Sequence, residues 1–544
     1  MPEQDYSEYA DLSPFELKDK LIALAQSGAD RMMLNAGRGN PNFLATLPRR
    51  AFLRLGDFAV EEAERSYSYL EAGFGGLPDA NGIDQRFEVF AHRHADTEGV
   101  GFLRRAIAYV KDQLGLDVNA FLAEMVGAFL GCNYPVPPRM LHNAEEIVKA
   151  YLAQEMYGPH PRGGAFSLFA TEGGTAGMTY LFQTLKANHL IAPGDKIALG
   201  TPIFSPYLEI PPLPDYQLEV VDVRMDEDAG WQFPDAELKK LEDPAVKVFC
   251  IVNPSNPPSV KLSDECLDRI AELVAKKRPD LFIVTDDVYG TFADDFVSLF
   301  AKCPRNTMCV YSFSKYFGAT GWRLGVIARH EENVIDEALK ALPQDKHEAL
   351  ARRYSSLTNE PGALLFIDRL VADSRAVALN HTAGLSTPQQ LQMTLLALHG
   401  LMDIDSRYKD AAKRLIRNRY KTLCLHVGIP PVVGPNEVNY YYLIDLQELA
   451  GKLHGQAFAK WIAEENRGTE FLFRLARETG VVLLPGKGFE VVDSSARVSL
   501  ANLTEANYSA IGICTHRILE ELYVEFEGRK KPGSRKKPAR RKKR

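Results

Sequence analysis

The sequence predicts an α/β protein with a large domain, built on a mostly parallel central sheet, and a smaller α+β domain. Between about residues 165 and 330, short apolar runs alternate with segments of helix length, a pattern typical of parallel sheets covered by helices. A chain of 544 residues exceeds what one hydrophobic core usually supports, so more than one domain is expected. The glycine-rich stretch 312–325 follows one of the apolar runs, and ligands bind at the carboxyl ends of such strands.

Seven apolar, β-rich runs define the predicted sheet. They lie at 166–170, 196–200, 218–223, 246–252, 281–285, 308–311 and 325–328. Helical patterns separate several of them, for example over 174–189 and 262–277. The strands are therefore expected to run mostly in parallel, with helices on both faces.

The remainder of the chain completes the predicted domain organisation. An N-terminal segment is expected to pack with the small domain, and a helical insertion precedes the large domain. The predicted boundaries are 1–60 for the N-terminal segment, 61–140 for the insertion, 141–400 for the large domain, 401–528 for the small C-terminal domain and 529–544 for a basic tail.

Composition excludes several classes of protein. Hydrophobic residues make up 46% and charged residues 25% of the chain, values typical of soluble globular proteins. The longest apolar candidate, 120–132, is interrupted by Glu124 and is too short for a membrane span. The seven cysteines are scattered without CxxC spacing, which argues against a disulfide framework or a zinc site. With an acidic N-terminus that does not resemble a secretory signal, we expect a cytoplasmic protein.

The C-terminal tail reverses the charge of the chain locally. Residues 528–544 carry eleven Lys and Arg and no acid. Without these eleven charges, the net charge of −7 becomes −18. Such a segment cannot bury enough apolar surface to fold and is expected to be disordered. It could bind nucleic acid through counterion release, but we favour a solubilising or self-associating appendage on an acidic body.

The stretch S-F-S-K-Y-F-G-A-T-G-W-R-L-G at 312–325 carries the main chemical prediction. Lys315 follows the apolar run 308–311, and Arg323 comes eight residues later. Glycines in this stretch allow a tight turn and a close approach to a ligand, and an arginine can hold a phosphate through two hydrogen bonds. Together they indicate a Schiff-base lysine beside an anion site, as pyridoxal phosphate requires. The alternative is a surface loop with an incidental lysine.

Three further motifs end predicted strands. T-E-G-G-T at 171–175 precedes a helix, whose N-terminus can bind an anion. Phe204, in T-P-I-F-S-P-Y, can stack on a flat ring, and Asn256, in N-P-S-N-P-P, can donate an amide N–H. Taken singly, these motifs have ordinary alternatives, namely a tight turn, core packing and turn chemistry.

Two ionisable residues complete the candidate site. Asp286, in T-D-D-V-Y, can keep a pyridine nitrogen protonated, and we prefer it to Asp287 because the D-x-V-Y spacing places Tyr289 near the phenolic oxygen of the ring. Its alternative is a helix N-cap. Arg497 lies inside an apolar strand, which is costly without an anionic partner. A substrate carboxylate or a structural ion pair would satisfy it.

The order of these motifs resembles that of the aspartate aminotransferase superfamily, the fold-type I pyridoxal phosphate enzymes, from about residue 30 to 520. The resemblance implies that Lys315 is the catalytic lysine and that Arg497 binds the substrate α-carboxylate. It also implies a dimer, in which Tyr134 reaches the phosphate of the neighbouring subunit, and no metal. The implied cofactor contacts are Gly173, Gly174, Thr175, Ser312, Ser314 and Arg323 at the phosphate, Asp286, Tyr289 and Asn256 at the ring atoms, and Phe204 on the ring face.

Within the superfamily, the chain is similar to the aspartate 4-decarboxylases in its size and in the blocks D-Y-S-E-Y-A-D-L-S-P-F-E-L-K and F-S-L-F-A-T-E-G-G-T-A-G-M-T-Y. This similarity implies conversion of L-aspartate to L-alanine and CO2, with secondary transamination that also uses 2-oxo acids. Arg38 and Lys18 are candidates for contact with the substrate β-carboxylate, and further association of dimers is expected through the insertion. Two alternatives remain: an aspartate or aromatic aminotransferase with an insertion, and an aminotransferase-like regulator that binds DNA through its tail.

Overall fold

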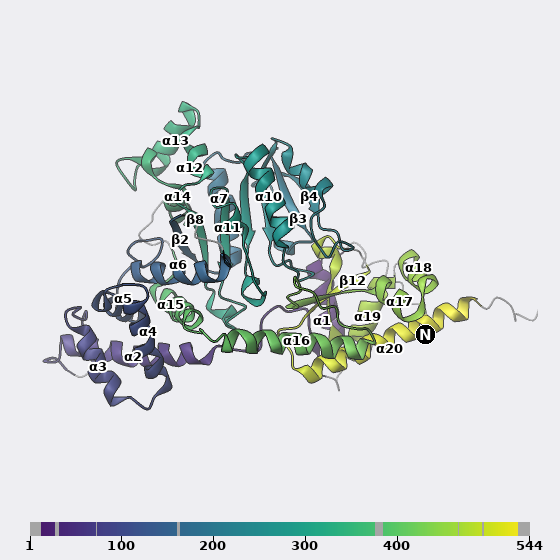
Figure 1. Ribbon diagram of the computed structural model, residues 1–544, viewed down its shortest axis with the longest axis horizontal. Helices are drawn as coiled ribbons and strands as arrows, with labels where there is room; N and C mark the ends of the chain where they lie inside the picture. The colour runs from purple at the N-terminus through teal and green to yellow at the C-terminus, as the bar shows by residue number, and fades with distance from the viewer. Residues whose placement is uncertain are drawn as a thin grey trace, which may run out of the picture. The chain divides into compact units, whose positions relative to one another are not determined.

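The computed structural model describes residues 12, 14–27, 32–71, 73–159, 164–375, 384–465, 467–491 and 494–530. By its internal contacts the chain forms two compact units (Figure 1). The larger unit comprises Gly39–Ile416 and Val433–Tyr441. The smaller unit comprises Met1–Arg38, Arg417–Val432 and Tyr442–Arg544.

A seven-stranded sheet forms the centre of the larger unit. Its spatial order is β2-β8-β7-β6-β5-β3-β4. The strands are β2 (Phe166–Thr171), β3 (Lys196–Thr201), β4 (Glu219–Arg224), β5 (Val246–Val252), β6 (Phe282–Asp286), β7 (Thr307–Ser312) and β8 (Gly325–His330). All neighbouring pairs are parallel except those of β8, which runs antiparallel to both β2 and β7. The predicted mostly parallel sheet is confirmed.

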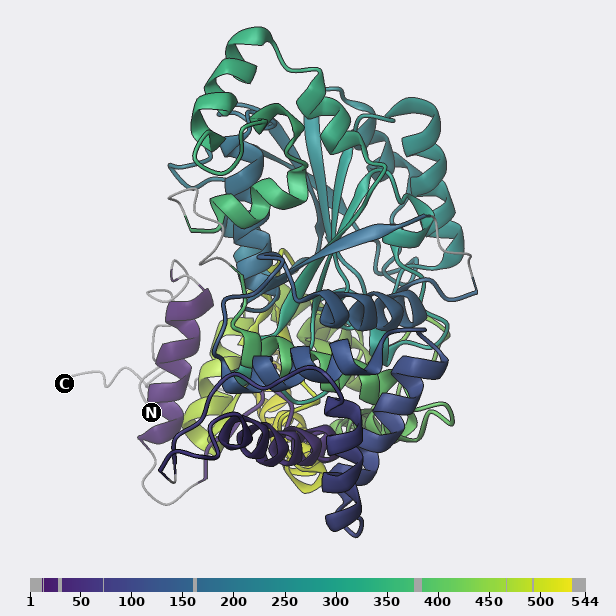
Figure 2. The same ribbon diagram turned by 90° about the vertical axis from the view of Figure 1, so that its left-hand side faces the viewer.

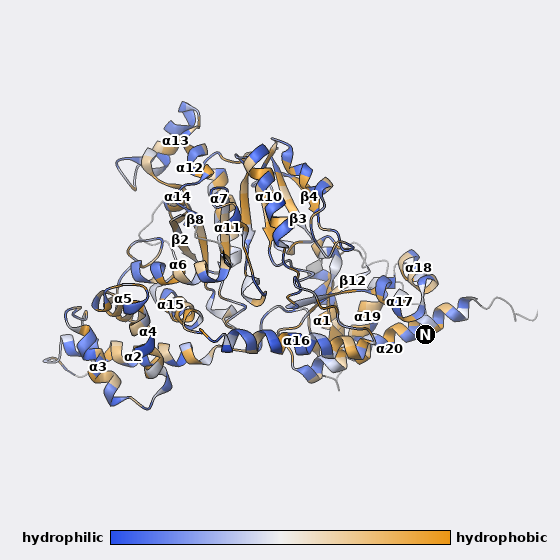
Figure 3. Ribbon diagram, viewed as in Figure 1, coloured by the Kyte–Doolittle hydropathy of each residue, from blue (hydrophilic) through white to orange (hydrophobic). Residues whose placement is uncertain are grey.

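Helices lie on both sides of this sheet (Figure 2). The strands are short apolar runs, and most of them are completely buried, so they are predominantly hydrophobic in Figure 3. Such strands are typical of sheets buried on both faces. The helices outside the insertion are α6 (His142–Met156), α7 (Gly174–Ala187), α8 (Ser205–Glu209), α9 (Asp235–Leu238), α10 (Asp264–Lys277), α11 (Leu299–Lys302), α12 (Val334–Lys340), α13 (Gln344–Tyr354), α14 (Phe366–Asp373), α15 (Thr387–Leu401) and the first part of α16 (Arg407–Val427).

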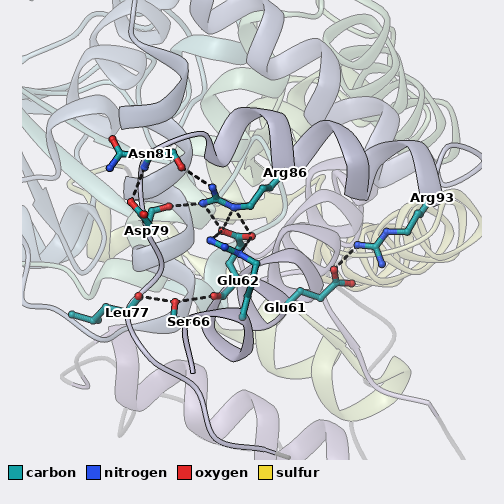
Figure 4. A network of polar contacts seen from close by, with 9 residues as sticks. Glu61, Glu62, Ser66, Leu77, Asp79, Asn81, Arg86 and Arg93 are labelled. Atoms are coloured by element: carbon teal, nitrogen blue, oxygen red, sulfur yellow. Dashed lines mark hydrogen bonds and ion pairs between the residues drawn. The ribbon is translucent and has the colours of Figure 1, made fainter. Parts of the chain in front are cut away.

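The predicted insertion is helical. Residues 61–140 contain the end of α2 (Thr46–Ser66), which begins in the predicted N-terminal segment, and all of α3 (Ile83–Arg93), α4 (Glu98–Asp112) and α5 (Val118–Leu130). These helices pack on one another and on α15. Near the end of α2, the buried carboxylate of Glu62 accepts hydrogen bonds from Arg86 at 2.8 and 2.9 Å (Figure 4). Arg86 also donates to the backbone of residues 79 and 81, so one buried ion pair joins α2, α3 and the turn between them.

The smaller unit contains α1 (Pro14–Gln26) and two small sheets. In one sheet β1 (Leu34–Asn35) pairs in parallel with β10 (Val481–Val482). In the other, β12 (Ser495–Ser499) lies between β11 (Leu484–Pro485) and β9 (Tyr441–Asp445). Its later helices are α17 (Leu446–His454), α18 (Gln456–Glu464), α19 (Arg467–Thr479) and α20 (Glu505–Lys530).

Helix α20 extends two residues into the segment 529–544 that the sequence assigns to the tail. Arg529 belongs to the helix because its guanidinium pairs with Glu465 at 2.8 Å and lies over the ring of Trp461. The rest of the predicted tail, residues 531–544, lies outside the described residues. Among the helices of the described ranges, none combines the length and apolar character needed to cross a membrane.

Candidate active site

The loop between β7 and β8, which we call the lysine loop (residues 313–324), leaves and re-enters the sheet at paired positions. Ser312 and Gly325 are register partners in the antiparallel pair β7–β8. The loop therefore begins and ends at one edge of the sheet, and Lys315 and Arg323 both project from it at the carboxyl end of β7. This is the position that the apolar run before Lys315 predicts.

Two glycines let Arg323 approach the start of α7. Gly173 has φ +91°, and a Cβ atom on it would lie 2.7 Å from an Arg323 guanidinium nitrogen. A Cβ atom on Gly325 would lie 2.7 Å from the Gly173 backbone. Arg323 itself adopts the left-handed conformation with φ 55°, which is uncommon for a residue with a side chain. Gly173 and Arg323, both of them predicted phosphate contacts, thus lie side by side.

Ser312, at the end of β7, and Ser314, in the lysine loop, add hydroxyl groups near the N-terminus of α7. The Ser312 hydroxyl donates to the Ser314 hydroxyl at 2.9 Å, and both side chains are buried. Ser312 also borders Gly174, where an added Cβ atom would lie 3.6 Å from the serine Cβ. Thr175 follows in the first turn of α7 and is exposed. Backbone N–H groups at a helix N-terminus and a guanidinium together favour an anion.

Lys315 lies beside the N-terminal end of the larger unit. Its Nζ donates to the Gly39 carbonyl at 3.2 Å. A Cβ atom on Gly39 would lie 3.3 Å from this Nζ and 2.3 Å from the Tyr441 hydroxyl. The Lys315 amine and the Tyr441 hydroxyl therefore border the same small space next to Gly39. A side chain at position 39 would fill this space.

Asp286 ends β6 in a buried position. Tyr207 donates to its carboxylate at 2.5 Å, and the Val288 N–H donates at 3.2 Å. Burial raises the pKa of Asp286, while the Tyr207 hydroxyl, the Val288 N–H and the charge of Lys315 act in the opposite direction. Phe204 packs edge-on against Tyr207, with ring centroids 5.6 Å apart. Asp286 and Phe204 are thus connected through Tyr207, which the sequence analysis does not single out.

The neighbouring Asp287 has a different environment. It is fully buried and accepts hydrogen bonds from Thr285 at 2.5 Å, from Ser298 and from the Cys309 thiol at 3.4 Å. Burial raises the pKa of Asp287 to about 7.

Tyr289 and Asn256 lie together, as the D-x-V-Y and N-P-x-N-P motifs predict. The Asn256 amide donates to the Tyr289 hydroxyl at 3.5 Å. The same hydroxyl is 2.8 Å from that of Tyr441. Tyr441 lies 152 residues further along the chain, and no local pattern indicates this contact.

Tyr134 lies in the turn between α5 and α6 and is 66% exposed. It lines a cavity of about 450 Å³ together with Glu172, which directly precedes Gly173, and with Arg375 and Gln389. The Arg375 guanidinium pairs with Glu172 at 3.3 Å.

The remaining candidates belong to the smaller unit. Arg497 lies on β12 opposite Leu484, is buried, and donates to the Gly37 carbonyl at 3.0 Å. Its guanidinium lies 4.7 Å from the centre of the Phe489 ring. Arg38 is exposed, and Lys18 on α1 pairs with Asp19 at 3.3 Å.

Comparison with known proteins identifies relatives of this site and fold. Residues 165–511 match the family described as aminotransferase class I and II. A Pseudomonas protein named bifunctional aspartate aminotransferase and L-aspartate beta-decarboxylase is 58% identical over 96% of this chain and 99% of its own length. An aspartate/prephenate aminotransferase of Nitrosomonas europaea is 30% identical over 25% of this chain and 35% of its own length.

Solved structures share the fold at lower identity. The aspartate aminotransferase from Thermus thermophilus with maleate has a TM-score of 0.57 at 18% identity, and the match covers 95% of this chain and 100% of that one. The aromatic aminotransferase from Pyrococcus horikoshii OT3 has a TM-score of 0.53 at 18% identity over 93% of this chain and 100% of that one. These matches confirm the predicted fold class.

Proposed function

Because the chain belongs to the class I and II aminotransferase family, we propose that it is a pyridoxal phosphate enzyme that converts L-aspartate to L-alanine and CO2, with a secondary aspartate aminotransferase activity. The observation that carries the proposal is the 58% identity to the Pseudomonas relative over 96% of this chain. This similarity covers the insertion helices, which lie outside the residues 165–511 that match the general family.

The described residues fit pyridoxal phosphate. A Cβ atom on Gly173 would lie 2.7 Å from an Arg323 guanidinium nitrogen, so the glycine lets this cation approach the helix N-terminus, and the two together suit a phosphate. Asp286 is a buried carboxylate that accepts hydrogen bonds from the Tyr207 hydroxyl and the Val288 N–H, which suits a protonated pyridine nitrogen. When bound, the cofactor supplies an electron sink for carbanion chemistry at the substrate.

Each candidate residue then has a defined task in this proposal. Lys315 attaches the cofactor and moves the proton at the substrate α-carbon, since an amine is the nucleophile that a carbonyl cofactor requires. Asp286 keeps the pyridine nitrogen protonated, while Tyr289 and Asn256 hydrogen-bond the phenolic oxygen. Phosphate contacts are assigned to Gly173, Gly174, Thr175, Ser312, Ser314 and Arg323, and ring stacking to Phe204.

Substrate binding places opposite demands on the two carboxylates. Arg497 is assigned the α-carboxylate, because a guanidinium can hold it with two parallel hydrogen bonds. The β-carboxylate must leave as neutral CO2 while the bonding electrons stay on the β-carbon, which takes up one proton. A strong ion pair would be lost in this step and would oppose it. We therefore assign the exposed Arg38, and Lys18, only a loose contact with this group.

Gas release distinguishes this function from the alternatives. Purified protein with pyridoxal phosphate and L-aspartate, but no 2-oxo acid, should release one CO2 for each L-alanine formed. Addition of 2-oxoglutarate should divert part of the aspartate to transamination. Transamination without CO2 release would identify a plain aminotransferase, and absence of both reactions would refute the proposal.

The proposal includes an oligomer with shared active sites. Tyr134 is exposed beside the segment that leads to Gly173, which suits contact with the phosphate of a second subunit across a two-fold axis. The insertion also exposes apolar side chains, among them Tyr69, Leu77 and Val89, which are 78%, 65% and 63% exposed. Of these three, Val89 lines a cavity of about 780 Å³, together with residues of α2, α3 and the turn between them. Exposed apolar patches of this kind favour association, so dimers are proposed to associate further through the insertion.

Light scattering tests the two levels of assembly separately. Leu77→Asp and Val89→Asp should reduce a larger assembly to dimers that still bind the cofactor. Val433→Asp provides the matched control, since Val433 is 82% exposed but lies outside the insertion. A fully active monomer would refute the shared site, whereas dimers alone in the unmodified protein would refute only the larger assembly.

A further inference from the structure

The lysine loop is held by side chains from three helices that lie outside the central sheet. Arg49 on α2 donates from one guanidinium nitrogen to the Phe317 carbonyl at 3.1 Å and from another to the Gly318 carbonyl at 2.7 Å. Tyr408 on α16 donates to the Tyr316 carbonyl at 2.8 Å. Gln389 on α15 donates to the Trp322 carbonyl at 2.8 Å. Side chains from outside the loop therefore bind the carbonyls of residues 316–318, which follow Lys315, and of Trp322, which precedes Arg323.

Arg49 makes the most extensive of these contacts. Besides the two loop carbonyls, its guanidinium donates to the Ala45 carbonyl at 2.6 Å, at the start of α2. Its charged carbon lies 4.6 Å from the centre of the Trp322 ring, within the range of a cation–π contact. One planar group thus contacts the lysine loop both at 317–318 and at Trp322. A lysine could not reproduce this geometry, since its ammonium is a single point of donation.

The lysine loop has a backbone conformation that needs such contacts to persist. Arg323 is in the left-handed region with φ 55°, and such a conformation persists only where the surroundings enforce it. Gly318 has φ 62°, and a Cβ atom there would lie 2.0 Å from the Phe43 carbonyl oxygen. The segment that precedes α2 therefore packs tightly on the loop, and Arg49 fixes the loop from the first turn of the same helix.

We propose that Arg49 is a positioning residue for the cofactor site, which holds the lysine loop so that Lys315 and Arg323 keep their separation and direction. This inference rests on the proposed cofactor, but not on which reaction the enzyme catalyses. It gives α2 a second role besides packing, because this helix binds the lysine loop near its start through Arg49 and pairs with α3 near its end through Glu62.

Cofactor affinity and apoprotein stability separate positioning from mere support. For Arg49→Lys, the Kd of the apoprotein for pyridoxal phosphate should rise about tenfold, as expected when hydrogen bonds from a charged donor are lost. The thermal midpoint of the apoprotein should stay nearly unchanged, so the additional stabilisation by saturating cofactor should shrink. The pH at which the absorbance of the bound cofactor titrates should also shift, because the environment of Lys315 changes.

Arg50→Lys is the matched control. Arg50 is the next residue on α2, but its guanidinium pairs with Glu98 at the surface and is 60% exposed, so its variant should bind the cofactor like the unmodified protein. Trp322→Leu provides a second variant, which removes the ring beneath Arg49 together with its contact with Phe52, and it should raise the Kd by a smaller factor. If Arg49→Lys does not yield folded apoprotein, this variant alone decides.

Several outcomes would overturn the inference. An unchanged Kd in Arg49→Lys, or in Trp322→Leu where that variant decides, would show that the contacts do not position the loop. Equal loss of stability in apoprotein and holoprotein would assign Arg49 a structural role only. If Arg49→Lys raises the Kd about tenfold but the unmodified protein transaminates aspartate without releasing CO2, the role of Arg49 stands and the decarboxylase function is refuted. The two proposals can therefore fail separately.

Discussion

Replacement of Tyr207 by phenylalanine should weaken the proposed contact between Asp286 and the cofactor. The Tyr207 hydroxyl donates to the Asp286 carboxylate at 2.5 Å, and both groups are buried. Burial and the neighbouring carboxylate raise the pKa of Tyr207 well above its ordinary value, so the hydroxyl keeps its proton and acts as the donor. The variant removes this donor and leaves the ring and its packing on Phe204 in place.

The size of the effect follows from the type of hydrogen bond. A hydrogen bond to a charged group contributes roughly 1.5–3 kcal/mol, which corresponds to about 10- to 100-fold in an equilibrium constant. The pKa of Asp286 is already raised by burial, and loss of the hydroxyl raises it further. A smaller fraction of Asp286 is then ionised at a given pH, so the defect should be larger at low pH and should diminish as the pH rises.

Titration of the apoprotein with pyridoxal phosphate between pH 5.5 and 8.5, followed by absorbance, measures this effect. Tyr216→Phe serves as the control, because Tyr216 packs on Phe182 and its variant removes a hydroxyl from a tyrosine that does not contact Asp286. A Kd in Tyr207→Phe that equals that of the control at every pH would refute the reasoning. A defect that grows with rising pH would refute the assigned direction of the pKa change.

Four further predictions concern the site and the chain ends. Lys315→Ala should abolish both turnover and the absorbance of the lysine-bound cofactor while circular dichroism stays unchanged; turnover above trace would contradict its role. Arg497→Ala should lower kcat/KM for aspartate, with a loss of transition-state stabilisation of roughly 2–5 kcal/mol. Steady-state kinetics that match those of the unmodified protein would count against this role. Asp287→Asn should flatten the pH dependence of stability measured by urea unfolding, because burial raises the pKa of Asp287 from 3.8 to about 7. The stability that the neutral Asp287 carboxyl contributes is complete below the unfolded pKa and falls by about 4 kcal/mol as pH rises from there through 7. An unchanged slope in the variant would contradict this. Deletion of 531–544 should leave CO2 release per subunit unchanged, whereas loss of activity in soluble truncated protein would make the tail part of the working assembly.

Most of the strands could be predicted because they are short apolar runs that the fold buries on both faces; β4 is the exception, with most of its residues at least partly exposed. The strand expected at 246–252 forms β5 over the same residues. The runs say nothing about order or direction, however, and the antiparallel β8 between β2 and β7 could not be read from them. Its apolar run at 325–328 looks like those of the parallel strands, because burial on both faces selects the same residue types whichever way the chain runs.

Most of the predicted cofactor contacts belong to motifs at the end of a strand or the start of a helix, whereas Arg497 lies within β12 and Tyr134 in the turn between α5 and α6. Lys315 and Asp286 follow directly from the apolar runs before them, since strand ends meet at one edge of the sheet. Tyr207 lies three residues after Phe204 in the same motif, T-P-I-F-S-P-Y. Its position one helical turn beyond the ring could have indicated that its hydroxyl also belongs to the site.

Arg49 shows why the supporting contacts could not be predicted in the same way. Its partner Phe317 lies 268 residues away, and the acceptors are backbone carbonyls, which every residue possesses and which leave no mark in the sequence. Arg49 and Arg50 are identical in type and adjacent in sequence, yet one binds the lysine loop while the other pairs with Glu98 at the surface. Residues that do chemistry at strand ends can be recognised from their type and their place after an apolar run. Residues that support them cannot, because their contacts depend on which side of a helix faces the loop, and only the packed structure decides that.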